Sequence, residues 1–340
     1  MAAVLALGTG CNEKITDVTE STAATSEEAV VTTKDTEATS APAEVNKGID
    51  RAGNEFIIPE KIDRIVSMAP STTQVLIELG LADKIVGIDT NSATYLDLLP
   101  AGVAQFDMMA PDNEAIAALD PDIVFTSGMS SVGGTSPFQS LIDSGISVAD
   151  IPSSSSIAGI KDDIIFIGNT VGKDSEAAAL TETMDAYIAA VEEVAATVPE
   201  GDTKTVLVMM NVPSADYPTI YTFGAGTYMN EMIEIIGAKN VFADQEGWLA
   251  VSVEEVLAAN PDVILMDCNW MPGADEAVKA LEGWENVTAV ANGDVYQIDE
   301  DLCSRPNQHV AEACAEWGKF VYPDQFNEFN MTLELLAEAA

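Results

Sequence analysis

Basic residues are few in this 340-residue sequence: 14 Lys and Arg stand against 56 Asp and Glu, which gives a formal net charge of −42 at pH 7. Nucleic-acid binding needs clustered Lys and Arg to neutralise phosphates, so this charge argues against a nucleic-acid partner. It also disfavours direct adsorption to anionic lipid. Otherwise the charge bears on solubility and not on fold.

Histidine and cysteine are scarce as well, with one His and four Cys. The single imidazole, His309, excludes a metal site built from several histidines. Cys268, Cys303 and Cys314 match neither a zinc motif nor a CxxC redox pair, and we expect them to be buried as small apolar side chains. No GxSxG motif or phosphate-binding loop is present, and Ser153–Ser156 has no neighbouring His. We therefore expect no enzyme, no catalytic residues, no metal site and no cofactor of the protein's own.

Long apolar runs are missing too, because no segment of the body reaches the roughly 18 to 20 apolar residues of a membrane span. Residues 1–11 form a short apolar run of small residues that ends in Cys11, like the end of a bacterial lipoprotein signal, although no Lys or Arg precedes it. We expect Cys11 to be lipidated and to anchor the protein to the outer side of the cell membrane. Residues 12–49 are rich in Ser, Thr and Glu and lack aromatics, which predicts a disordered tether.

Two segments of the first half of the chain are echoed in the second half. NEAIAALDPDIVF at residues 113–125 is echoed by VEEVLAANPDVIL at residues 253–265, and VLIELG at residues 75–80 is echoed by MIEIIG at residues 232–237. Two copies are too few for a solenoid, so we expect two similar lobes that face each other. A cleft between lobes is where small ligands tend to bind.

Short β-branched runs alternate with helical patterns in both halves, which indicates parallel sheets in α/β lobes. We expect Ser71 or Thr72 to cap the helix that ends at Leu79. The predicted strands are Arg64–Met68, Ile85–Ile88, Asp122–Thr126 and Ser147–Ile151 in the first half, and Thr205–Met210, Val263–Asp267 and Val295–Ile298 in the second.

A long helical pattern joins the two halves. Apolar residues recur at helical spacing from Asp174, which we expect to cap the helix, to Thr197. At about 1.5 Å per residue such a helix spans roughly 35 Å, enough to bridge two lobes. We therefore expect an N-terminal lobe of residues 50–173, a linking helix of residues 174–198 and a C-terminal lobe of residues 199–340.

The ordered motifs of the body resemble one family. RIVSMAPS at residues 64–71, ELG at residues 78–80, the repeated segments and SRP at residues 304–306 are similar to the substrate-binding proteins of bacterial ABC importers for vitamin B12, ferric siderophores and haem. The resemblance implies two α/β lobes joined by one long helix, with little hinge closure and the ligand held between the lobe tips.

The resemblance also implies a membrane partner, the permease and ATPase complex of an ABC importer. Each lobe of such proteins offers a surface glutamate to arginines of the permease, and the matching positions are Glu114 and Glu254. Carboxylate–arginine contacts can be bidentate. The alternative is that these glutamates only stabilise helix N-termini, which is worth about 0.3 to 1 kcal/mol each. We expect a monomer; a tethered adhesin or sensor, or a chelatase-like enzyme, are the less favoured alternatives.

Ligand contacts should come from loops at the carboxyl ends of the strands. Phe106, Tyr221 and Trp248 fall near aromatic positions that line the cleft of the vitamin B12-binding proteins that the chain resembles, although a single aromatic is more often part of a core. The predicted ligand-binding set is Asn91, Tyr95, Phe106, Met108, Ser127, Met129, Tyr221, Trp248, Asn269, Trp270, Asp299 and Arg305.

Charge bears on which ligand is bound. Carboxylate siderophores and haem propionates call for cationic partners, and Arg305 is the one arginine in an expected cleft loop. A corrinoid is bulky, close to neutral and rimmed by amides, so aromatic faces with Asn and Ser suit it better. We therefore expect a metal chelate, and a corrinoid first. A hydroxamate siderophore stays open, and haem is less favoured because one His and few tyrosines could ligate iron. We expect His309 to be structural.

Overall fold

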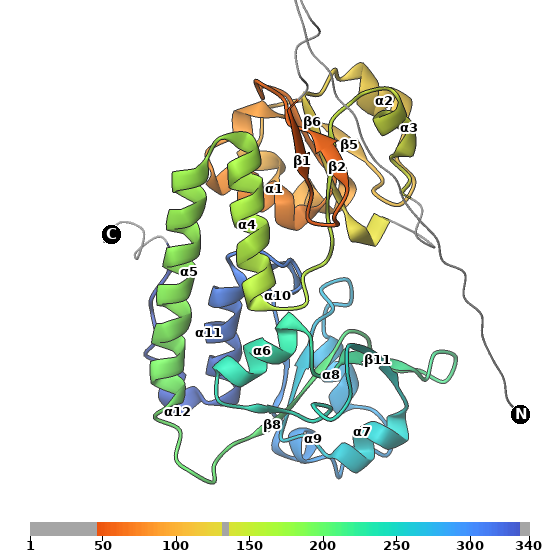
Figure 1. Cartoon of the computed structure of the whole chain (residues 1–340). Helices are drawn as coiled ribbons and strands as arrows, with labels where there is room; N and C mark the ends of the chain where they lie inside the picture. The colour runs from red at the N-terminus through yellow and green to blue at the C-terminus, as the bar shows by residue number, and fades with distance from the viewer. Residues whose placement is uncertain (1–45, 131–135, 334–340) are drawn as a thin grey trace, which may run out of the picture. The chain divides into compact units, whose positions relative to one another are not determined.

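Two separate parallel β-sheets organise the chain (Figure 1). The computed structural model describes residues 46–130 and 136–333; Cys11 lies outside the described residues. The first sheet has the strand order β5-β4-β3-β6-β7 and the second β10-β8-β12-β13, with all neighbours parallel. The predicted α/β fold with two lobes is confirmed. The strands are β3 (Ile65–Ser67), β4 (Ile85–Asp89), β5 (Ala104–Phe106), β6 (Ile123–Ser127), β7 (Val148–Ile151), β8 (Thr205–Met209), β10 (Lys239–Asn240), β12 (Val263–Met266) and β13 (Val295–Gln297).

A hairpin precedes the first sheet. β1 (Lys47–Ile49) pairs antiparallel with β2 (Glu55–Ile57), so β1 lies within the last residues of the predicted tether. The turn between these strands is anchored to the lobe, because the carboxylate of Asp50 accepts the backbone N–H of Asp150 at 3.0 Å and Arg51 pairs with Asp163 at 2.6 Å. These contacts order the chain earlier than its composition indicates.

The helix after β3, α1 (Pro70–Glu78), begins without a side-chain cap. The prediction that Ser71 or Thr72 caps it was wrong: Ala69 is the N-cap and Pro70 is the first helical residue. Proline suits this position because its φ is already helical and its missing N–H is not needed there. The helix ends as expected, since Gly80 follows it with a φ of +73°.

Shorter helices complete the first lobe. α2 and α3 lie near each other at one end of the first sheet (Figure 1). The segment η2 follows β4 and carries two of the predicted ligand-binding residues. These elements are η1 (Ala82–Lys84), η2 (Thr90–Leu98), α2 (Asn113–Ala118), η3 (Gly128–Ser130) and α3 (Gln139–Asp143).

Two long helices, α4 (Ile157–Val171) and α5 (Asp174–Ala195), run side by side. Figure 1 shows α5, in green, passing from the first lobe to the second, where it contacts α6 (Tyr228–Ile235), α11 (Val310–Val321) and α12 (Pro323–Phe326). Asp174 does not cap α5, because the chain turns at left-handed Gly172 and Lys173 already occupies the N-cap position. The exact division of the body at residues 174 and 199 stays a prediction.

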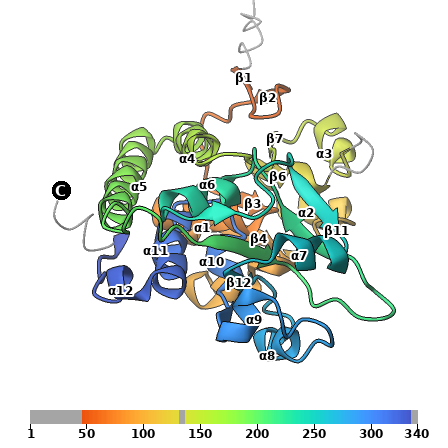
Figure 2. The same cartoon turned by 90° about the horizontal axis from the view of Figure 1, so that it is seen from below.

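The second lobe carries an antiparallel ribbon that the sequence did not predict. β9 (Ile220–Phe223) pairs with β11 (Trp248–Val251) beside the parallel sheet. Seen from below, α5, α11 and α12 gather on one side of the molecule and α7, α8 and α9 on the other (Figure 2). The remaining helices of this lobe are α7 (Val253–Ala259), α8 (Ala274–Lys279), α9 (Thr288–Asn292) and α10 (Glu300–Cys303).

The repeated sequence is also a structural repeat. A carboxylate oxygen of Asp122 accepts the N–H of Arg64 at 2.9 Å just before β3, and one of Asp262 accepts the N–H of Thr205 at 2.8 Å at the start of β8. Among the described residues other than glycine, Asp120 and Asn260 have positive φ, +49° and +46°. These two residues occupy equivalent positions of the repeat. Both lobes therefore build the turn into the strand after the repeated helix in the same way.

Within residues 46–130 and 136–333, no helix combines the length and the apolar composition that crossing a membrane requires.

Candidate ligand-binding site

A cavity of about 700 Å³ lies between the two lobes. The start of α1, the η2 segment, the ends of β6 and β7, and one face of α4 line it from the first lobe. The start of α6, the ribbon and the segment Glu300–Pro306 line it from the second. Small-molecule sites typically occupy about 300 to 1,000 Å³, so the cavity has the size of a ligand site.

The first-lobe wall stands at the carboxyl ends of the parallel strands. Pro70 and Ser71 follow β3, Asn91 follows β4, Ser127 ends β6 and Pro152 follows β7. Because parallel strands end at a common edge, residues far apart in the sequence meet there. The topology of the sheet therefore creates this wall.

Trp248 supplies the aromatic face of the second-lobe wall. It opens β11, and its indole packs edge-on against Phe223, with ring centroids 6.0 Å apart at 81°. The side chain is nevertheless 57% exposed, while Phe223 is buried. An indole fixed on one edge and open to a cavity can stack on a flat ligand.

Four methionines line the same cavity. Met108 and Met129 come from the first lobe, and Met210 and Met229 from the second. Unbranched thioether side chains are flexible and polarisable, so they adapt to ligands of irregular outline. The apolar part of the wall thus suits a large ligand without a simple shape.

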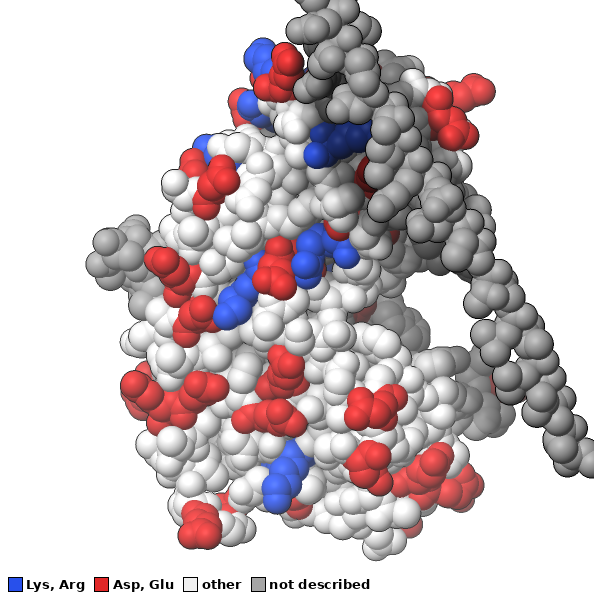
Figure 3. Space-filling view, viewed as in Figure 1, with Lys and Arg blue, Asp and Glu red and all other residues white. Residues whose placement is uncertain are grey.

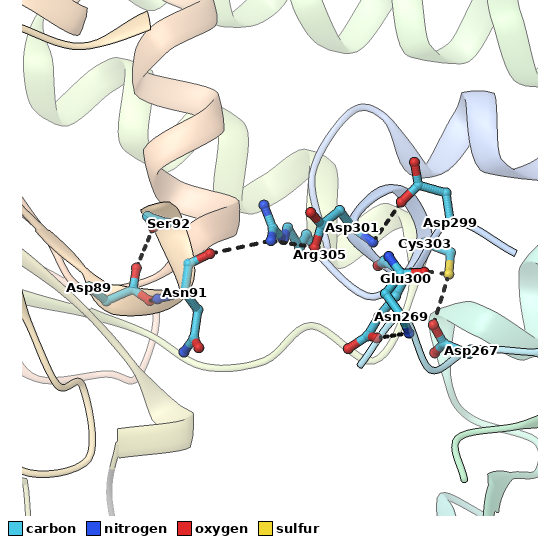
Figure 4. Close-up of polar contacts among 10 residues, drawn as sticks. All are labelled: Asp89, Asn91, Ser92, Asp267, Asn269, Asp299, Glu300, Asp301, Cys303 and Arg305. Carbon is cyan, nitrogen blue, oxygen red and sulfur yellow. Dashed lines mark hydrogen bonds and ion pairs between the residues drawn. The ribbon is translucent and has the colours of Figure 1, made fainter. Parts of the chain in front are cut away.

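Arg305 connects the lobes at the edge of the cavity (Figure 4). Its guanidinium pairs with Asp301 of α10, donates to the backbone oxygen of Asn91 at 3.3 Å and lies 5.1 Å from the centroid of the Tyr95 ring. Nη1 of Arg305 is buried and has no hydrogen-bond partner among the described residues. A buried donor without a partner destabilises the free protein.

Two buried carboxylates support the walls. Burial raises the pKa of Asp163 on α4, although hydrogen bonds from Ser154 and Arg51 favour its charged form. Burial also raises the pKa of Asp267 to about 6, even though Asp267 accepts hydrogen bonds from Ser304 and Cys303. Asp267 therefore holds Ser304 in place at the cavity wall.

Comparison with known proteins assigns the chain to a family. The family model described as periplasmic binding protein matches residues 65–302. The chain belongs to this family. The resemblance seen in the sequence is thereby confirmed.

Several known proteins are similar to this chain. It is 33% identical to an uncharacterised ABC transporter substrate-binding lipoprotein of Bacillus subtilis, over 82% of this chain and 87% of the relative. It is 27% identical to a cobalamin-binding protein of Halobacterium salinarum, over 78% of this chain and 71% of the relative. A solved periplasmic solute-binding protein of Staphylococcus epidermidis, described as a possible iron-binding protein, superposes with a TM-score of 0.67 at 28% identity and covers 77% of this chain and 100% of that one.

These matches establish the general role of the periplasmic binding protein. It is an extracytoplasmic substrate-binding protein of an ABC importer, a class that binds small ligands and works with a permease and ATPase complex. The names of these relatives describe substrate-binding, cobalamin-binding and solute-binding proteins.

The structure brings half of the predicted ligand-binding residues together at the cavity. These residues come from both lobes. The predicted residues that line the cavity are Asn91, Met108, Ser127, Met129, Trp248 and Arg305.

The other predicted residues lie elsewhere. Phe106 is 8% exposed and packs in the core beneath Gly87, because β5 turns this side chain into the lobe instead of toward the cavity. Tyr95 and Asp299 line a smaller groove of about 200 Å³ behind Arg305. Tyr221, Asn269 and Trp270 are exposed on the second lobe and are not part of the cavity wall.

Sequence reasoning missed several lining residues. Pro70 and Ser71 directly follow a predicted strand, so the rule about carboxyl ends of strands would have found them. Ile164 and Ile167 of α4 and Met229 of α6 carried no such signal, because their spacing is that of any buried helix face.

Outside the cavity, Glu114 and Glu254 occupy matching places. Each is the second residue of its helix, α2 or α7, and each is exposed. Neither makes a hydrogen bond or ion pair with the described part of the chain, and the caps of the two helices are the side chains of Asp112 and Ser252. Both carboxylates are therefore available to a partner.

The three cysteines of the second lobe are buried, as predicted, and each is a free thiol. No group of three or more His, Cys, Asp or Glu side chains able to hold a metal ion occurs among the described residues.

Proposed function

We propose that this periplasmic binding protein captures a corrinoid of the vitamin B12 type and delivers it to the permease of its ABC importer. The observation that carries this proposal is the interlobe cavity of about 700 Å³, which combines an exposed indole, four thioethers and one guanidinium. A corrinoid presents a broad apolar ring face and a rim of amides, which match these groups. The 27% identity to a cobalamin-binding protein supports the same ligand class.

Charge supports a ligand that is not strongly anionic. The cavity wall holds the carboxylates of Asp163, Glu300 and Asp301 against the single guanidinium of Arg305. Figure 3 shows acidic side chains spread over the lower lobe, with few basic ones among them. Both the wall and the surface repel ligands with several carboxylates, such as citrate-type siderophores or haem.

A hydroxamate siderophore is the second candidate. It is bulky and weakly charged, and the similar Staphylococcus epidermidis protein is described as a possible iron-binding protein. Haem is less favoured: His309 points to Glu312 and Glu78 instead of the cavity, and the hydroxyl of Tyr228, which lines the cavity, already donates to the backbone oxygen of Cys303 at 3.0 Å.

The remaining roles follow from the same proposal. Lipidation of Cys11 would hold the monomeric body near the membrane by its tether, and the Bacillus subtilis relative is a lipoprotein. The protein itself performs no catalysis and has no cofactor of its own; the metal arrives within the bound chelate. Glu114 and Glu254 would dock one lobe each onto arginines of the permease.

A ligand panel tests the proposal. Purified protein would be titrated with cobalamin, ferric hydroxamate and catecholate siderophores and haem, followed by thermal shift and absorbance. We expect cobalamin to raise the melting temperature in a saturable way, since binding to the native state alone stabilises it. A shift with a siderophore or haem but none with cobalamin would refute the corrinoid and select the alternative.

A further inference from the structure

The ionisable groups of the cavity wall are unevenly paired. Asp163 has a cationic partner in Arg51, at 2.6 Å, and Asp301 has one in Arg305. Glu300 lines the same cavity and has no ion-pair partner among the described residues; one of its carboxylate oxygens accepts the backbone N–H of Asn269 at 2.6 Å. Glu300 is therefore a negative charge on the wall that no cation of the described chain neutralises.

The surroundings of Glu300 add negative charge. Figure 4 shows Asp299, Asp301 and Asp267 around it on the second lobe. Apart from burial, the charges of Glu300 and Asp299 raise the pKa of Asp267. The nearest cation in this view, Arg305, is already held by Asp301. This end of the cavity consequently attracts hydrogen-bond donors and cations.

The Glu300 carboxylate is the ionised acceptor at this end of the cavity that no cation of the described chain pairs with. A primary amide carries two N–H donors beside its oxygen, so an amide of the ligand can donate a hydrogen bond to Glu300. An ionised carboxylate has hydrogen-bond acceptors alone, and the negative charge of Glu300 would repel it.

We propose that Glu300 is a specificity-determining residue that makes the cavity select corrinoids with amide side chains and reject those whose side chains are free carboxylates. This inference rests on the proposed function, that the ligand is a corrinoid. Two like charges placed together at a binding site repel each other, so we expect about a tenfold or greater loss of affinity when the amide facing Glu300 becomes a carboxylate.

The test compares ligands that differ in one group. Calorimetry at pH 7.5 would measure the affinity of the protein for cyanocobalamin and, separately, for each of its monocarboxylic acids, in which one propionamide is hydrolysed. We expect at least one acid to bind about tenfold or more weakly than cyanocobalamin. In Glu300→Gln the ratio of the affinity for cyanocobalamin to the affinity for that acid should fall below about threefold, because glutamine keeps the acceptor for Asn269 and removes the charge.

A control separates the local effect from net charge. Glu285 is an exposed carboxylate of the same lobe that does not line the cavity, so Glu285→Gln should leave the affinity ratio as it is in the wild type. The role of Glu300 would be overturned if the wild type bound cyanocobalamin and all the acids with equal affinity. It would also be overturned if the affinity ratio were the same in Glu300→Gln as in the wild type. Either result would leave the corrinoid proposal intact. Absence of binding by cyanocobalamin itself would overturn both.

Discussion

Trp248 presents its indole to the cavity from the first position of β11, and the edge-on contact with buried Phe223 holds the ring in place. Trp248 was predicted from its place near the aromatic positions that line the cleft of the vitamin B12-binding proteins that the chain resembles, and it lines the cavity. Phe106 carried a similar signal and lies in the core. A single sequence cannot show which way a short edge strand turns its aromatic side chain, since alternate residues face opposite sides.

Trp248→Ala should weaken ligand binding by about 1 to 3 kcal/mol, because the variant loses the aromatic surface that the ligand would cover. The side chain is half exposed without ligand, so the free protein should stay folded. Calorimetry with cobalamin measures the loss, and Trp270→Ala, which removes an exposed indole outside the cavity, is the matched control. Equal affinity of wild type and Trp248→Ala would remove the indole from the site.

His309 has the structural role expected from the sequence. It precedes α11 and contacts Glu312 at 2.7 Å on its own helix and Glu78 of α1 at 3.3 Å. Burial alone would lower the pKa of His309, but the two carboxylates outweigh burial and raise it from 6.5 to about 9. The imidazolium therefore links the second lobe to the first at neutral pH.

The free energy of unfolding should report this link. A histidine whose pKa is higher in the folded chain stabilises it fully below pH 6.5, and this contribution is lost as the pH rises through about 9. His309→Gln should cost roughly 2 kcal/mol near pH 6 and progressively less toward pH 10. Urea denaturation of both proteins at several pH values gives the difference; one that stays constant over this range would speak against a charged His309.

At the scale of elements, the long helices and buried strands were predictable because their periodicity is strong over many residues. The ribbon β9–β11 and strand β5 were not, since strands of three or four residues beside turns leave little pattern. The missing cap of α1 had a different cause. Ser71 and Thr72 are good capping residues in general, and the proline ahead of them moves the start of the helix one position earlier.

A glycine of α4 allows α4 and α5 to approach each other closely. A Cβ on Gly168 of α4 would lie 2.3 Å from the Cβ of Ala177 of α5, far inside van der Waals contact. Alanine at this place would gain about 1 kcal/mol of helix propensity, but forcing two packed helices apart costs about 1 to 3 kcal/mol or more. The steric cost should prevail at so short a separation.

Gly168→Ala should therefore lower the free energy of unfolding by about 1 to 2 kcal/mol, measured by chemical denaturation. Asn169→Ala, at the neighbouring exposed position of the same helix, should change it by less than about 0.5 kcal/mol. A Gly168→Ala protein as stable as the wild type would show that α4 and α5 can move apart without cost.

At the scale of the whole molecule, the internal repeat anticipated the architecture. The repeat predicted two lobes, and the paired turns at Asp120 and Asn260 show that it extends to backbone geometry. The cavity itself was only half predicted. Its walls depend on how α4, α6 and the ribbon pack between the lobes, and such tertiary packing leaves no periodic mark in the sequence.

The repeat also places one exposed glutamate on each lobe, where it would dock onto the permease. Glu114→Ala combined with Glu254→Ala should abolish uptake by cells while ligand affinity stays within about twofold, because both carboxylates are exposed and lie outside the cavity wall. Uptake of labelled cobalamin and calorimetry measure the two quantities. Glu60→Ala with Glu285→Ala removes the same charge from exposed positions and should preserve uptake. Normal uptake in the first double variant would refute docking through these residues.

The central claim is that the space between the lobes holds the ligand, and a crystal structure of the protein grown with cobalamin tests it most directly. The account predicts electron density for one corrinoid in the interlobe cavity, in contact with Trp248 on one side and Pro70 and Ser71 on the other. Density at any other surface, with this cavity filled by solvent alone, would contradict it.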